Sequence, residues 1–168
     1  MKVGILSDTH NNAANTRRAL DAFRARRVER LIHCGDVTNA ETVLLFAGWT
    51  VTFVWGNMDA YRDELIAATR MIGAAGPQYS ATVSAGECLI GVTHGHDYGL
   101  LTGLIMAGKY TYVCHGHTHE RRDEFRRPYS VRVLNPGALG GSCPQSRSIC
   151  VLDTDADTAD FIEFPNMR

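Results

Sequence analysis

The chain has 168 residues, of which 45% are hydrophobic and 21% charged. These values exclude a disordered or fibrous chain and suit a single domain over residues 1–168. The formal net charge of −1 provides no overall positive field, which disfavours binding to a nucleic-acid polymer or to an anionic membrane. Since no apolar stretch is long enough for a membrane span or a signal peptide, we expect a cytoplasmic protein with no membrane partner.

The first part of the chain alternates predicted strands and helices. Short apolar runs that stop at polar residues predict buried strands at 2–6, 30–34 and 51–55. Helices are predicted between and after them, following the N-cap candidates in 11–15, from Asn39 to Phe46, and over 61–69. This alternation indicates parallel strands joined by crossover helices.

The second part has a different pattern. Two strand-like runs, 79–83 and 88–93, flank the turn sequence Ser84-Ala85-Gly86 and predict a hairpin. A helix is predicted over 100–107, and further strands follow at 110–114, 123–125, 131–134, 148–152 and 159–164. Two mixed sheets with helices outside them accommodate both parts.

The cysteines give no sign of a metal or disulfide site, whereas the positions of the histidines do indicate a functional site. The five cysteines are odd in number and contain no CxxC pair, which argues against a disulfide framework or a cysteine-rich zinc site. Of the seven histidines, five fall in two short segments, His94/His96 and His115/His117/His119. Histidines that merely fill a core would not cluster in this way.

Residues of metal-binding type follow five predicted strands. The segments are Asp8-Thr9-His10, Gly35-Asp36, Gly56-Asn57, His94-Gly95-His96 and His115-Gly116-His117-Thr118-His119. In open α/β sheets, ligands bind outside the carboxyl ends of the strands, so these segments converge if the strands are neighbours. About seven carboxylate, amide and imidazole ligands are too many for one tetrahedral zinc ion, and they fit two divalent ions that share a carboxylate.

These segments resemble the five motifs of the calcineurin-like metallophosphoesterases, D-x-H, G-D, G-N-H-D/E, H and G-H-x-H. The chain length and the later Asn135-Pro136-Gly137 are similar to the small prokaryotic phosphodiesterase branch of that superfamily. The resemblance implies an α/β fold, a four-layer αββα sandwich of two mixed β-sheets flanked by helices.

The resemblance also implies a binuclear metal centre and a reaction. Two metal sites would be formed by Asp8, His10 and His119 and by Asn57, His94 and His117, with Asp36 shared by both. The implied cofactors are two divalent metal ions, with Mn²⁺ expected first and Ni²⁺, Fe²⁺, Co²⁺, Zn²⁺ or Mg²⁺ as alternatives. A hydroxide bridging the ions would attack a small phosphodiester substrate, which makes Asp36 and Asn57 catalytic residues.

The third motif departs from the family pattern. Met58 stands where many members have a histidine that is thought to protonate the leaving group, and a methionine cannot donate a proton. His96 is the nearest replacement acid in sequence, although it could equally contact the phosphate. Asp59, left without a histidine partner, is expected to cap the following helix. We therefore predict hydrolysis of diesters with acidic leaving groups rather than of monoesters.

Asn57, His96 and Arg121 are the candidate substrate-binding residues. Arg121 begins an arginine-rich stretch directly after the histidine motif and could touch a second phosphate, or it could belong to a solvated surface. His33 and His115 lie one step away from ligand positions, so strand alternation predicts structural roles for them. Cys34 and Cys114 are expected in the core.

Two other functions stay open. A non-catalytic metal-binding scaffold for protein interactions could have the same fold, since a retromer subunit of similar fold also lacks the histidine of the third motif. Against that, every ligand position is kept here. A nuclease is disfavoured by the near-neutral charge. The physiological substrate, the native metal and homo-oligomerisation are left open by the sequence.

Overall fold

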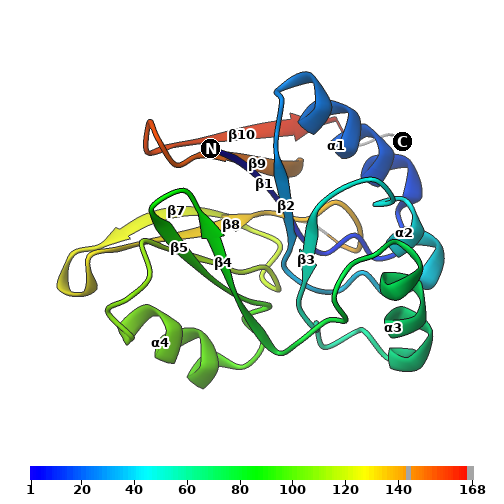
Figure 1. The fold of residues 1–168 in the computed structure, drawn as a ribbon, viewed down its shortest axis with the longest axis horizontal. Helices are drawn as coiled ribbons and strands as arrows, with labels where there is room; N and C mark the ends of the chain where they lie inside the picture. Colours follow the sequence, from blue (N-terminus) through cyan, green and yellow to red (C-terminus); the bar gives the residue numbers. More distant parts are fainter. Residues whose placement is uncertain (143–144, 166–168) are drawn as a thin grey trace.

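The computed structural model describes residues 1–142 and 145–165, which form two five-stranded β-sheets packed face to face (Figure 1). The first sheet consists, in spatial order, of β10 (Thr158–Phe164), β9 (Arg147–Asp153), β1 (Lys2–Leu6), β2 (Arg30–His33) and β3 (Val51–Phe53). The second consists of β4 (Ser80–Ala85), β5 (Cys88–Thr93), β6 (Tyr112–Cys114), β8 (Val131–Pro136) and β7 (Arg121–Arg126).

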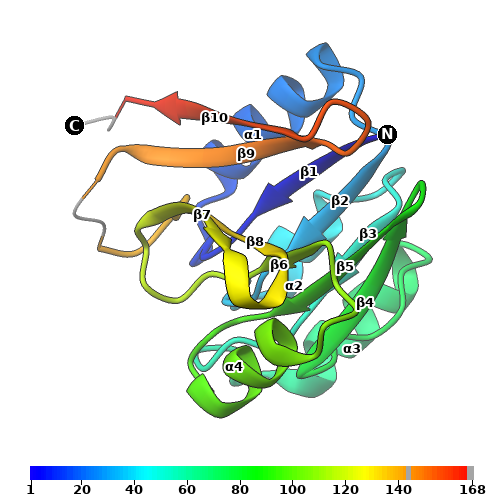
Figure 2. The same ribbon diagram turned by 90° about the vertical axis from the view of Figure 1, so that its left-hand side faces the viewer.

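Helices cover the outer faces of both sheets. The first sheet carries α1 (Ala13–Ala25), α2 (Ala40–Leu44) and α3 (Arg62–Met71), and the second carries α4 (Tyr98–Met106). A short 3₁₀ helix, η1 (Arg127–Tyr129), joins β7 to β8. Figure 1 shows α1 to α3 on the right-hand side of the molecule and α4 at its lower left, and Figure 2 looks onto the side that carries α4. In the described part of the chain, no helix is both long and apolar enough to cross a membrane.

Three apolar clusters separate the layers. One fills the space between the first sheet and its helices and includes Phe23 and Phe46. A second, with Ile5 and Ile32, lies between the two sheets, and a third, with Leu101, lies under α4. Strand alternation produces this arrangement because successive side chains of β1 and β2 point to opposite faces. The expected four-layer αββα sandwich is confirmed.

The parallel strands determine where the predicted site residues lie. In the first sheet β1, β2 and β3 are parallel, and in the second β5, β6 and β8 are parallel. Parallel neighbours end at the same edge of a sheet, so the loops that follow them are neighbours too. The remaining strands pair in antiparallel fashion, including the predicted hairpin β4–β5.

Several element bounds differ from the sequence predictions. Helix α4 begins at Tyr98 rather than at residue 100, because Asp97 Oδ1 accepts the backbone N–H of Leu100 at 2.9 Å and caps the helix there. Helix α2 ends at Leu44 and continues in turns, and the strand predicted over 110–114 is restricted to β6. Strand β7 is longer than the predicted 123–125 and lies at the edge of its sheet.

Candidate metal centre

The loops after β1 and β2 are tied together by their backbones. The N–H of Asp8 donates to the carbonyl of Gly35 at 3.0 Å, and the N–H of His10 donates to the carbonyl of Asp36 at 3.1 Å. These two bonds place the first and second sequence motifs side by side, as the convergence of parallel strands predicts.

Left-handed backbone conformations are concentrated in these loops. Positive φ angles occur at five of the predicted metal ligands, namely Asp8 (52°), His10 (41°), Asp36 (57°), His117 (69°) and His119 (60°). Such angles are uncommon for residues other than glycine and persist only where surrounding contacts hold them. Their concentration in these loops is typical of a functional site.

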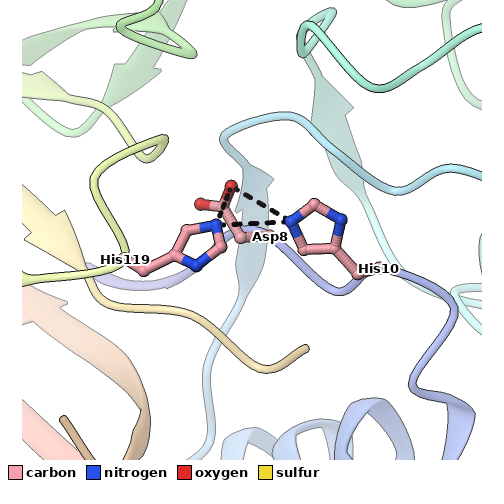
Figure 3. A group of neighbouring side chains, drawn as sticks. All are labelled: Asp8, His10 and His119. Carbon is pink, nitrogen blue, oxygen red and sulfur yellow. Dashed lines mark hydrogen bonds and ion pairs between the residues drawn. The ribbon is translucent and has the colours of Figure 1, made fainter. Parts of the chain in front are cut away.

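One compact group joins the first and last motifs. Ligand atoms of Asp8, His10 and His119 all lie within 4.8 Å of one another. Nε2 of His119 lies 3.3 Å from Nε2 of His10 and 3.3 Å from Oδ1 of Asp8, and Nε2 of His10 lies 3.8 Å from the same oxygen. Figure 3 shows the three side chains directed at one point from segments more than a hundred residues apart.

A second compact group contains Asp8, Asp36 and His94, again within 4.8 Å. Oδ2 of Asp36 lies 3.4 Å from Nε2 of His94 and 3.7 Å from Nε2 of His10. One oxygen of Asp36 therefore faces an imidazole of each group, the position that a shared ligand requires.

The other predicted site residues surround His94. Oδ1 of Asn57 lies 3.1 Å from Nε2 of His94, and the ring of His117 lies 5.2 Å from the His94 ring, centroid to centroid. The backbone N–H of His117 donates to Oδ2 of Asp8 at 3.0 Å. The exposed ring of His96 lies 5.4 Å from that of His94 and 6.2 Å from that of His117. The structure thus brings the five motifs together.

Backbone carbonyls orient two of the imidazoles. Nδ1 of His94 lies 2.7 Å from the carbonyl oxygen of Cys34, and Nδ1 of His119 contacts the carbonyl oxygen of Ser142. A proton on Nδ1, donated to a carbonyl, leaves Nε2 free to bind a metal ion. Oδ1 of Asp8 is buried without a hydrogen-bond partner among the described residues. Imidazole nitrogens and carboxylate oxygens so arranged fit borderline divalent cations.

The carboxylates and imidazoles of this cluster shift one another's pKa values. Burial by itself raises the pKa of Asp36, but hydrogen bonding to His94 and the charge of that imidazole outweigh it and lower the pKa below its ordinary value. Burial likewise lowers the pKa of His94, while the carboxylates of Asp36 and Asp8 raise it above the ordinary value. Contact with the Asp8 carboxylate also raises the pKa of His119. The cluster therefore favours the negative form of the Asp36 carboxylate, as cation binding requires.

The prediction that Asp59 caps the following helix is wrong. The N-cap of α3 is Tyr61, which makes no side-chain capping bond. Asp59 is 3% exposed and turns back toward the second motif, where its carboxylate accepts backbone N–H groups of Gly56, Asp36 and Thr38. The donors lie partly in a loop more than twenty residues earlier, and no local sequence pattern indicates them.

A loop that the sequence analysis did not assign to the site borders the first group. Residues 137–142 follow β8, and the N–H of Gly140 donates to the carbonyl of Asp8 at 2.7 Å. A Cβ on Gly141 would lie 2.8 Å from Cδ2 of His10, so only glycine fits there. The Gly140-Gly141 pair was the available sequence signal for this close approach.

Asn135 holds the loop of the last motif in place through side-chain hydrogen bonds. Its side chain is fully buried, and its Nδ2 donates to the carbonyl of Gly116 at 2.9 Å and to Oγ1 of Thr118 at 3.1 Å. Its Oδ1 accepts the N–H of Gly137 at 3.0 Å. The resemblance had singled out this residue without a physical role, and the structure provides one.

Arg121 lies on β7 with its guanidinium engaged by another strand. Its NH1 lies 2.6 Å from Oε1 of Glu163 on β10 and 3.4 Å from Oγ of Ser146. Within the described residues these contacts direct the side chain to β10 rather than to the histidine cluster. A contact with substrate stays a prediction for this residue.

His33 and His115, which lie one step away from ligand positions, are buried, and so are Cys34 and Cys114. His33 accepts the N–H of Gly35 at Nδ1, and its Nε2 lies 3.1 Å from Oγ1 of Thr9, which favours the tautomer protonated at Nε2. His115 contacts the carbonyl of Gly116 through Nδ1. Cys34 and Cys114 lie in the apolar cluster between the sheets. The core positions predicted for the two cysteines are confirmed, and structural roles stay a prediction for the two histidines.

Comparison with known proteins agrees with this geometry. The family model of the calcineurin-like phosphoesterase superfamily domain matches residues 1–157. The chain belongs to the calcineurin-like phosphoesterase superfamily. Its relatives in sequence and in structure include phosphodiesterases, so the chain is a hydrolase that acts on phosphoric ester bonds.

Individual relatives of this superfamily support the assignment. A phosphodiesterase from Methanocaldococcus jannaschii is 34% identical over 158 residues, which cover 92% of this chain and 94% of the relative. The solved structure of an archaeal phosphodiesterase matches with a TM-score of 0.89 and 32% identity, covering 98% of this chain and all of that one. Vps29 from Entamoeba histolytica, solved in complex with Zn²⁺, shares the fold, with a TM-score of 0.70, 20% identity and coverage of 97% and 99%.

Proposed function

We propose that this chain hydrolyses small phosphodiesters at a binuclear metal centre. The observation that carries the proposal is the position of Asp36, one oxygen of which faces Nε2 of His10 in the first ligand group and Nε2 of His94 in the second. Similarity in sequence to a phosphodiesterase from Methanocaldococcus jannaschii and in structure to an archaeal phosphodiesterase supports the choice of diesters as substrates.

The first proposed metal site is the first ligand group, and the second is built from His94 and the side chains next to it. Asp8, His10 and His119 would hold one divalent ion, Asn57, His94 and His117 the second, and Asp36 would bind both. Bound there, the ions would acidify a water molecule and neutralise the charge that grows on the phosphoryl oxygens. We propose Mn²⁺ as the native ion, since the mixed oxygen and nitrogen ligands are permissive for several borderline cations.

Residues at the open side of the cluster would position the substrate. Asn57 and His96 are both exposed and adjoin His94, so the amide and the imidazole can donate to phosphoryl oxygens. Two divalent cations against the two carboxylates of Asp8 and Asp36 leave a local positive charge that attracts a phosphate anion even though the whole chain is nearly neutral.

Met58 determines which leaving groups can depart. Its side chain is 56% exposed, next to Asn57, and offers no proton to a departing alkoxide. We expect the purified enzyme, loaded with Mn²⁺, to hydrolyse an aryl phosphodiester at least about ten times faster than a simple alkyl monoester, because the aryl oxide needs no general acid. The comparison is made from kcat/KM values.

Two outcomes of that assay would contradict the proposal. Faster turnover of the alkyl monoester would show that another group supplies the proton and that diesters are not preferred. No hydrolysis of either substrate by metal-loaded protein would contradict the proposed reaction itself.

A further inference from the structure

The carboxylate of Asp59 is a buried charged group that the proposed reaction does not use. Only 3% of the residue is exposed, and both oxygens accept backbone N–H groups. Oδ2 accepts from Gly56 at 2.7 Å and from Asp36 at 3.1 Å, and Oδ1 accepts from Thr38 at 2.8 Å. Burying a carboxylate costs free energy unless its oxygens accept hydrogen bonds in this way, so these three bonds are what keeps the Asp59 side chain buried.

Asp36 and Asp59 bind each other's loops. While Asp59 accepts the N–H of Asp36, Oδ1 of Asp36 accepts the N–H of Met58, the residue just before Asp59, at 2.8 Å. This reciprocal pair fixes the side-chain rotation of Asp36. With Oδ1 held by the Met58 N–H, Oδ2 is the oxygen that faces His10 and His94.

The loop held by Asp59 needs such support. Asp36 and Thr38 have φ angles of 57° and 71°, in the left-handed region that side-chain-bearing residues rarely adopt. The two loops also approach very closely, since a Cβ on Gly56 would lie 2.0 Å from Oδ1 of Asp36. Without an acceptor for their N–H groups, the strained residues would relax toward ordinary backbone angles.

We infer that Asp59 is a positioning residue that fixes the orientation in which the carboxylate of Asp36 is offered to the metal ions. It acts through hydrogen bonds to the backbones of both loops and touches neither metal nor substrate. This inference rests on the proposed binuclear site, and it assigns to the last residue of the Gly56-Asn57-Met58-Asp59 motif a role that is independent of any histidine at position 58.

The test compares Mn²⁺ binding by metal-free wild-type protein and by Asp59→Asn. The amide keeps the size of the side chain, but its NH₂ group confronts backbone N–H donors and cannot accept from them. We expect affinity for Mn²⁺, measured by calorimetric titration, to fall roughly 10- to 100-fold, as for other groups that orient a metal ligand. The electron paramagnetic resonance spectrum should also lose the features of coupled Mn²⁺ ions, a change that altered stability alone would not cause.

A matched control variant and an independent measurement complete the test. Asp63→Asn makes the same chemical change on the exposed first turn of α3 and should leave binding unchanged. If Asp59→Asn does not fold, hydrogen exchange in metal-free wild-type protein decides instead, because the amides of Gly56, Asp36 and Thr38 should be protected.

The outcomes separate this inference from the proposed function. Unchanged affinity and spectrum in folded Asp59→Asn, or rapid exchange of the three amides, would overturn the positioning role and leave the proposed function standing. Failure of the wild-type protein to bind Mn²⁺ would overturn both.

Discussion

Replacing Asp36 with asparagine should reduce Mn²⁺-dependent hydrolysis of an aryl phosphodiester by at least about a thousandfold. The amide oxygen can still accept the Met58 N–H, so the loop should keep its shape. What is lost is the negative charge at Oδ2, which faces His10 and His94 at 3.7 and 3.4 Å. The measurement is kcat/KM at saturating Mn²⁺, together with the number of ions bound per chain.

Asp21→Asn provides the control for that prediction. Asp21 lies on the exposed face of α1, where it pairs with Arg24, and the same change there should leave hydrolysis unaffected. Activity of Asp36→Asn within about tenfold of wild type would mean that the shared carboxylate is not required, which the proposed mechanism does not permit.

Acidification should destabilise the metal-free protein through His33. Burial lowers the pKa of His33 to about 4, well below its ordinary value of 6.5. The unfolded chain therefore binds a proton at a pH where the folded protein does not, so stability is full above pH 6.5 and falls as the pH drops toward 4. A difference of about 2.5 pH units corresponds to about 3 kcal/mol of unfolding free energy.

Urea unfolding of wild type and His33→Gln measures this contribution. Glutamine can accept the Gly35 N–H or donate to Thr9, but it does not take up a proton in this range. Between pH 7 and pH 4.5, in the presence of a chelator, the unfolding free energy of wild type should fall by about 2 kcal/mol more than that of the variant. Equal losses in the two proteins would show that His33 is not held neutral by the fold.

Strand periodicity predicted two mixed sheets with helices outside them, and the resemblance to the metallophosphoesterases implied their four-layer arrangement. Apolar runs that stop at Asp8, Asp36 and His94 indicate the ends of three strands, two in the first sheet and one in the second, and the structure brings those residues together. Alternation likewise separated the ligands from His33 and His115, which are both buried.

What sequence could not indicate depends on contacts between distant loops. Asp59 resembles a helix cap in its local context, yet its partners are backbone N–H groups of the Asp36 loop. Arg121 follows the last motif directly, but its partner Glu163 belongs to β10, more than forty residues later. In both cases the deciding partner is set by tertiary packing and not by sequence neighbours.

Anomalous diffraction from crystals of this protein soaked in Mn²⁺ tests the central proposal most directly. The account predicts two Mn²⁺ peaks with Asp36 between them, one bound by the group of Asp8, His10 and His119 and the other by Asn57, His94 and His117. A single peak that Asp36 does not contact, or no peak among these side chains, would contradict it.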